Sequence, residues 1–287
     1  GKTYLSAFDV AAFNPSKCLY VVHRRNIAEA AMKTFKNVIG QNKSYGIYSG
    51  DKREIEADFL FTTIQTMSRE SNLNQFKADH FDYIIVDETH RAGAESYLRV
   101  IEYFDAQFLL GMTATPERTD GLDIFSLFDH NIAYEIRLHQ ALAENMLAEF
   151  HYYGVQDLTV DGQTIEDKSE FRYLEADERI NNILDTSKRY GTDDGVIRGL
   201  VFCSRKEECK ALSLAFNSKG FKTVALTGDN SEVDRKDAID QLESDNRDRL
   251  DYIFTVDIFN EGIDIPRVNQ ILMLRPTNSA IIFVQQL

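Results

Sequence analysis

The sequence is poor in positive charge and in cysteine, and it has no long apolar run. Its 287 residues hold 32 Lys and Arg against 46 Asp and Glu, a net charge of −14. A chain this acidic does not coat nucleic acid by bulk charge, although a local basic groove is compatible with it. No apolar stretch approaches the roughly 20 residues of a membrane-spanning helix. We therefore expect a soluble, cytoplasmic protein with no membrane partner.

The three cysteines are Cys18, Cys203 and Cys209, an odd number without C-x-x-C spacing and with apolar neighbours. This pattern favours a reduced intracellular chain over a disulfide framework, and it does not predict a thiol metal site. The hydrophobic share of 43%, with 19 Phe and 13 Tyr, is typical of a globular protein. The length exceeds what one hydrophobic core usually supports, so we expect two domains.

An apolar run, Tyr83–Val86, breaks abruptly into Asp87 and Glu88. Because the run shows no polar alternation, it predicts a strand that is covered on both faces, as in a parallel sheet with helices on each side. Ligands of such sheets bind at the carboxyl ends of the strands. One carboxylate could hold a hydrated Mg²⁺ while its neighbour takes a proton from an attacking water. Taken alone, the run fits a simple acidic turn equally well.

The first three residues, Gly1-Lys2-Thr3, match the last three positions of the phosphate-loop pattern G-x-x-x-x-G-K-[ST]. In a complete loop the backbone N–H groups and the helix N-terminus cradle phosphates, Lys reaches the β/γ oxygens and Thr ligates Mg²⁺. Together with Asp87 and Glu88, these residues supply both halves of one metal–phosphate site. The pair of motifs therefore favours nucleotide binding over the acidic turn.

The same layout of elements occurs twice along the chain. It consists of a strand, a capped helix, a strand, a Gly-Asp turn, a strand and a Thr, in residues 18–63 and again in 200–255. We expect Asn26 to cap the first helix and Ser204 with Glu207 to form a capping box on the second. Two similar α/β domains follow from this repetition, with the nucleotide in a cleft between their strand ends.

Four motifs in order resemble motifs I, II, III and V of superfamily 2 helicases. They are Gly1-Lys2-Thr3, Asp87-Glu88-Thr89-His90, the run from Gly111 to Arg118, and the run from Asn260 to Pro266. Within the DEAD/DEAH-like members, the chain is most similar to bacterial helicases related to the large subunits of type III and type I restriction enzymes. The resemblance implies two tandem RecA-like domains, residues 1–140 and 141–287, each a mainly parallel sheet flanked by helices.

The resemblance also implies roles for single residues. Lys2 would bind the β/γ-phosphates of ATP beside Gly1, Thr3 and Asp87 would hold Mg²⁺, and Glu88 would activate water. In the second domain Gly262 and Asp264 would contact the nucleotide, unless they only form a turn before Pro266. The resemblance implies that four residues couple the two domains: His90, Thr113, Thr115 and Gln285. For the two threonines, the alternative is a turn whose hydroxyls form local hydrogen bonds.

Four loops are implied to line a nucleic-acid path. Short hydroxyls, backbone amides and a few Arg side chains suit a phosphate track, although solvated helix starts are the plainer interpretation. The residues concerned are His23, Arg24, Arg25, Thr63, Gln65, Ser204, Arg205, Thr227 and Gly228.

The chain starts within motif I and stops at Gln285, which resembles the opening of motif VI. We therefore expect both ends to be cut from a longer parent with further domains, a first strand to be missing beside Tyr83–Val86, and the isolated fragment to be inactive. The predicted function is that of a DNA-dependent ATPase, a helicase or translocase. An RNA helicase and a non-catalytic nucleic-acid-binding scaffold are the alternatives.

Overall fold

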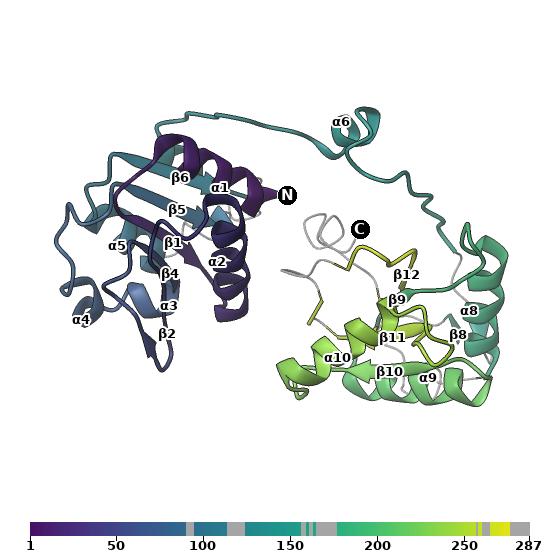
Figure 1. The fold of residues 1–287 in the computed structure, drawn as a ribbon. Helices are drawn as coiled ribbons and strands as arrows, with labels where there is room; N and C mark the ends of the chain where they lie inside the picture. The colour runs from purple at the N-terminus through teal and green to yellow at the C-terminus, as the bar shows by residue number, and fades with distance from the viewer. Residues whose placement is uncertain are drawn as a thin grey trace. The chain divides into compact units, whose positions relative to one another are not determined.

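The computed structural model describes residues 1–89, 95–113, 124–155, 159–160, 163–164, 177–256, 258–259 and 265–275. The chain forms two compact units, Gly1–Glu149 and Phe150–Leu287 (Figure 1). Each contains a mainly parallel sheet flanked by helices, which confirms the predicted α/β class. No helix in these described ranges has the length and apolar character needed to cross a lipid bilayer.

A six-stranded sheet in the order β3-β2-β4-β1-β5-β6 organises the first unit. Every neighbouring pair is parallel except β2 with β3. The strands are β1 (Cys18–Val22), β2 (Tyr45–Ser49), β3 (Lys52–Arg53), β4 (Phe59–Thr63), β5 (Tyr83–Asp87) and β6 (Phe108–Met112). All five residues of β1, β4 and β5 are buried, as expected for central strands covered on both faces.

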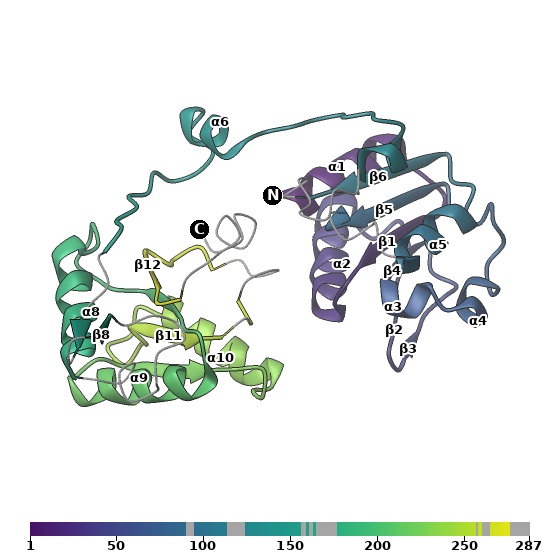
Figure 2. The ribbon, with the colours of Figure 1, turned by 180° about the vertical axis from the view of Figure 1, so that it is seen from behind.

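Helices cover both faces of this sheet. α1 (Lys2–Phe13) and α2 (Arg25–Ile39) lie side by side on one face in both views (Figures 1 and 2) and bury a core with β1, β4 and β5. The opposite core contains α3 (Ile64–Met67), α4 (Glu70–Leu73) and α5 (Glu95–Tyr103). The unit continues with a 3-10 helix, η2 (Ile124–Phe128), and α6 (Leu138–Ala143).

The place expected for a missing strand, beside Tyr83–Val86, was wrong. β5 is hydrogen-bonded along one edge to β1 and along the other to β6, with Tyr83 opposite Cys18 and Phe108. A further strand therefore cannot pair with β5, because both of its edges are already used.

The second unit is built on a four-stranded parallel sheet in the order β10-β11-β9-β12. Its core lies in two clusters, one joining α8 and α9 to β9 and β11, the other joining α10 to the same strands (Figure 2). The elements are α8 (Asp177–Tyr190), β9 (Gly199–Phe202), α9 (Lys206–Ser218), β10 (Thr223–Leu226), α10 (Glu232–Glu243), β11 (Tyr252–Thr255) and β12 (Gln270–Met273). A short antiparallel pair, β7 (Thr159–Val160) with β8 (Gln163–Thr164), precedes them.

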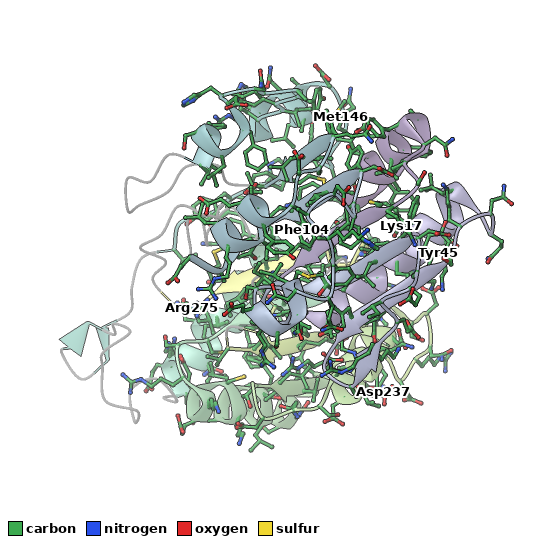
Figure 3. The ribbon with its side chains drawn as sticks, turned by 90° about the vertical axis from the view of Figure 1, so that its left-hand side faces the viewer. Lys17, Tyr45, Phe104, Met146, Asp237 and Arg275 are labelled. Carbon is green, nitrogen blue, oxygen red and sulfur yellow. The ribbon has the colours of Figure 1, made fainter. Side chains whose placement is uncertain are left out.

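In each unit, an aspartate just before one strand accepts a hydrogen bond from the backbone just before the neighbouring strand. Asp82 Oδ2 accepts a hydrogen bond from the backbone N–H of Lys17 at 2.9 Å, next to β1 (Lys17 is labelled in Figure 3). Asp251 Oδ2 accepts one from the N–H of Lys222, next to β10, also at 2.9 Å. The shared device supports the repetition that the sequence indicates.

The two predicted helix caps differ from the structure. Arg24 and Arg205 occupy the N-cap positions of α2 and α9. Asn26 instead accepts a hydrogen bond from the next N–H in the chain. The backbone of Ser204 donates to Glu208 rather than forming a box with Glu207. Side chains within one turn compete for the same free N–H groups, so spacing alone does not fix the cap.

Candidate active site

The carboxyl end of β5 meets the first turn of α1. Lys2 Nζ donates a hydrogen bond to Glu88 Oε1 at 2.7 Å, and both side chains remain partly exposed, at 35% and 19%. The contact arises because α1 packs on the β5 face of the sheet, where the Tyr83 hydroxyl donates to Asp9 of α1. Two predicted residues far apart in sequence thus form one ion pair.

Asp87 is the buried member of the acidic pair, with 5% of its surface exposed. The Tyr20 hydroxyl donates to its Oδ2 atom at 3.0 Å, and the N–H of Glu88 donates to Oδ1 at 2.9 Å. Burial raises the pKa of Asp87, and the Glu88 charge adds to this rise. The Lys2 ammonium and the two hydrogen bonds act in the opposite direction.

Glu88 adopts a left-handed backbone conformation, with φ of 55°, which is uncommon outside glycine. The chain therefore turns sharply right after β5. Asp87 stays on the buried face shared with Tyr20, while Glu88 reaches Lys2. The turn therefore places the two carboxylates in different environments, Asp87 buried and Glu88 partly exposed.

Thr3 lies near the same buried carboxylate. Burial and Asp87 raise the pKa of Tyr20 well above its ordinary value, whereas hydrogen bonds with Thr3 and Ser6 lower it. Ser6 Oγ also donates to the carbonyl of Thr3 at 2.9 Å. Gly1 is the N-cap of α1, so the free N–H groups of a 12-residue helix begin here.

The donor set fits a metal that arrives with a phosphate ligand. Within the described part of the chain, no group of three or more His, Cys, Asp or Glu residues could hold an ion. Asp87 and Thr3 offer one carboxylate and one hydroxyl. Mg²⁺ commonly takes one or two carboxylates and completes its shell with substrate phosphates and water.

The three cysteines are buried and free. Burial raises the pKa of the Cys18 thiol, and contact with Cys209 together with burial raises that of Cys203. Cys18 and Cys203 are therefore not reactive thiolates.

In the first unit, the loops predicted to contact nucleic acid follow β1 and β4, which pair with Val22 opposite Thr63. Arg24 and Gln65 are exposed there, and His23 is half-buried. Arg25 is held by Asp51 at 2.5 Å and by Glu29 at 3.1 Å.

Thr63 is buried, and its hydroxyl bonds with those of Ser49 and Thr66, at 3.1 and 2.9 Å. Arg25 and Thr63 thus have internal partners, whereas Arg24 and Gln65 present exposed side chains at the same edge of the sheet.

The corresponding loops of the second unit follow β9 and β10. An ion pair joins them, since Lys206 Nζ lies 2.8 Å from Asp229. Ser204 and Arg205 are half-buried and Gly228 is exposed. Thr227 is buried, and its N–H donates to the Asn230 side chain at 2.8 Å.

Five predicted residues, His90, Thr115, Gly262, Asp264 and Gln285, lie outside the described residues. Thr113 follows β6 directly and is half-buried.

Sequence reasoning missed Tyr20. The available signal was a tyrosine inside the apolar run Cys18–Val22, because a buried hydroxyl needs a hydrogen-bond partner.

Two family descriptions match the chain. "Type III restriction enzyme, res subunit" matches residues 1–118, and "helicase conserved C-terminal domain" matches residues 178–287. The first match contains Lys2, Asp87 and Glu88, and the second covers the parallel sheet of the second unit. The chain has the core of a superfamily 2 helicase.

Individual relatives are distant. IRC3 of Saccharomyces cerevisiae, described as a candidate ATP-dependent helicase, is 27% identical over 94% of this chain and 40% of its own length. The chain spans about half the length of the curated relatives that it matches.

Two solved structures share the helicase fold. The type ISP restriction-modification enzyme LlaBIII bound to DNA is 18% identical with a TM-score of 0.70, covering 100% of this chain and 24% of that protein. Dbp5 of S. cerevisiae bound to RNA and ADP BeF3 is 15% identical with a TM-score of 0.59, covering 100% and 72%.

Proposed function

We propose that this chain is the motor core of a nucleic-acid-dependent ATPase that acts as a DNA helicase or translocase. The observation that carries the proposal is the Lys2–Glu88 ion pair beside buried Asp87 at the start of α1. The three groups are one cation for phosphates, one buried carboxylate for a metal and one carboxylate for water; the cation binds the water-activating carboxylate directly, and the buried carboxylate is the preceding residue of the chain. Phosphoryl transfer to water needs these three groups.

The ion pair links nucleotide binding to activation of the base. Lys2 Nζ lies 2.7 Å from Glu88 Oε1. When phosphate oxygens take Lys2, the Glu88 carboxylate loses its cation and becomes able to accept a proton from water. The N–H groups of the first turn of α1 contribute to the same phosphate site.

Thr3 and Asp87 are the residues that would hold Mg²⁺. The ion supplies neutralisation of charge on the transferring phosphoryl group. Asp87 is suited to this role because hydrogen bonds hold both of its carboxylate oxygens, so the carboxylate is oriented in advance.

The preference for DNA rests on the restriction-type family match of residues 1–118, and on the DNA-bound restriction enzyme among the structural neighbours. The RNA-bound Dbp5 supports RNA as the second candidate polymer. Exposed Arg24 and Gln65 are the better phosphate contacts of the first unit, since Arg25 would first have to leave Asp51 and Glu29.

The ATPase rate of the whole protein that carries this chain, titrated with single-stranded DNA, duplex DNA and RNA at two salt concentrations, tests the proposal. We expect stronger stimulation by DNA, with an apparent affinity that falls with log salt by about 0.7–0.9 per neutralised phosphate. Stronger stimulation by RNA would reverse the polymer assignment. A rate that no polymer changes would favour the non-catalytic scaffold.

A further inference from the structure

Tyr20 occupies the middle of β1 and is fully buried. Its ring stacks on Phe61 with centroids 5.5 Å apart and meets Phe35 edge-on at 5.5 Å. These apolar contacts fix the ring, and the hydroxyl at its far end reaches Asp87 Oδ2 at 3.0 Å. Core packing of the ring therefore fixes the position of the Tyr20 hydroxyl beside Asp87.

The sheet register explains why this tyrosine meets this carboxylate. Tyr20 lies opposite Ile85, and Asp87 is two residues further along β5. Side chains two residues apart in a strand point to the same face, so Tyr20 and Asp87 share the face that α1 covers. A shorter side chain at position 20 would not span the diagonal to Asp87.

We propose that Tyr20 is a positioning residue for the metal site: its hydroxyl holds Asp87 Oδ2 and so fixes the carboxylate in the orientation that takes Mg²⁺. This inference rests on the proposed function, in which Asp87 is a metal ligand. The other oxygen, Oδ1, accepts the Glu88 N–H and keeps a second lone pair for a cation or its bound water. Partners of metal ligands typically change metal affinity by about 10- to 100-fold when removed.

The surroundings of the Tyr20 hydroxyl point to the same role. The Thr3 and Ser6 side chains at the start of α1 also interact with it. Thr3, the other residue assigned to Mg²⁺, is thus among the groups that act on this hydroxyl, which donates directly to Asp87. A tyrosine with only a packing role would also need a hydrogen-bond partner for its buried hydroxyl, but that partner could be any polar group of the sheet.

Tyr48 provides that comparison. It is as buried as Tyr20, at 1% exposure, and its hydroxyl accepts a hydrogen bond from Gln75 Nε2 at 2.9 Å. It belongs to the core on the opposite face of the sheet, away from the Asp87 cluster. Tyr48→Phe therefore removes a buried hydroxyl without touching the candidate active site.

The test is a calorimetric titration of ADP into the whole protein that carries this chain, repeated at a series of Mg²⁺ concentrations. Thermal unfolding checks that each variant is folded. Mg²⁺ should strengthen ADP binding. Tyr20→Phe should raise the Mg²⁺ concentration that gives half of this effect by about 10- to 100-fold. ADP affinity without Mg²⁺ should stay at the parental value. Tyr48→Phe should lower thermal stability by a similar amount and leave the Mg²⁺ dependence unchanged.

A double-substitution cycle with Asp87→Asn shows whether Tyr20 acts through Asp87. Adding Tyr20→Phe to Asp87→Asn should cause no further loss of Mg²⁺ dependence. Full additivity, or an unchanged Mg²⁺ dependence in Tyr20→Phe alone, would overturn the positioning role. A parental protein whose ADP binding shows no response to Mg²⁺ would instead overturn the proposed function itself.

Discussion

A buried ion pair beneath one of the proposed nucleic-acid loops gives a sharp stability prediction. Arg179 of α8 and Glu208 of α9 meet at 2.8 Å, with side chains 10% and 0% exposed. Glu208 also accepts the backbone N–H of Ser204 at 2.9 Å. The pair therefore joins two helices and holds the start of the loop after β9.

Removing one partner should cost far more than removing both charges. Arg179→Met leaves the Glu208 carboxylate buried without its cation, which costs about 3–5 kcal/mol. Adding Glu208→Gln removes the stranded charge, while the amide oxygen can still accept the Ser204 N–H. The double variant should therefore recover most of the lost stability.

Hydrogen exchange followed by mass spectrometry measures this effect in the second unit alone. Each 1.4 kcal/mol corresponds to a factor of ten, so the slowest β9 amides of Arg179→Met should exchange roughly 10²- to 10⁴-fold faster. Amides of β1 in the first unit serve as the internal control. Less than tenfold acceleration, or a double variant less stable than Arg179→Met, would refute the reasoning.

Three further predictions concern packing, pH and the polymer. Gly199→Ala should destabilise the second unit by about 1–3 kcal/mol in denaturant unfolding, because its added Cβ would overlap the Tyr252 ring; parental stability would contradict this. Burial lowers the pKa of His80, so the unfolded chain takes up a proton before the folded one does as pH falls below about 6.5. The free energy of unfolding should therefore decrease over that range, and less so in His80→Gln, as measured by denaturant titration at several pH values. Arg24→Ala should reduce the slope of log DNA affinity against log salt concentration by about one phosphate contact, and it should not change ATP affinity in the absence of DNA. An unchanged slope would show that Arg24 does not contact the nucleic acid.

Much of the first unit could be predicted from the sequence, because short apolar runs and turn residues are local signals. The run Tyr83–Val86 lies in a fully buried parallel strand, as its lack of polar alternation predicts. The sequence also predicts that Lys2 and Glu88 belong to one metal–phosphate site, and the structure brings the two side chains together, although the ion pair itself was not predicted.

The order of strands in the sheet and the hydrogen-bond and ion-pair partners of single side chains could not be predicted. The error over the neighbours of β5 arose because strand order depends on pairings far apart in the sequence. The Tyr20–Asp87 bond requires a register that no local pattern reveals. Arg25 shares its loop with Arg24, yet only the folded chain brings Asp51 to it.

ATP turnover and ATP affinity in variants of Lys2 and Glu88 test the central claim most directly. In the whole protein that carries this chain, Glu88→Gln should cut turnover by about 10²- to 10⁴-fold and keep ATP affinity at least at the parental value, because Lys2 loses its carboxylate partner. Lys2→Ala should instead weaken ATP binding, and Glu95→Gln, an exposed surface carboxylate, should change neither quantity. Parental turnover in Glu88→Gln, or parental ATP affinity in Lys2→Ala, would contradict the assignment of this site.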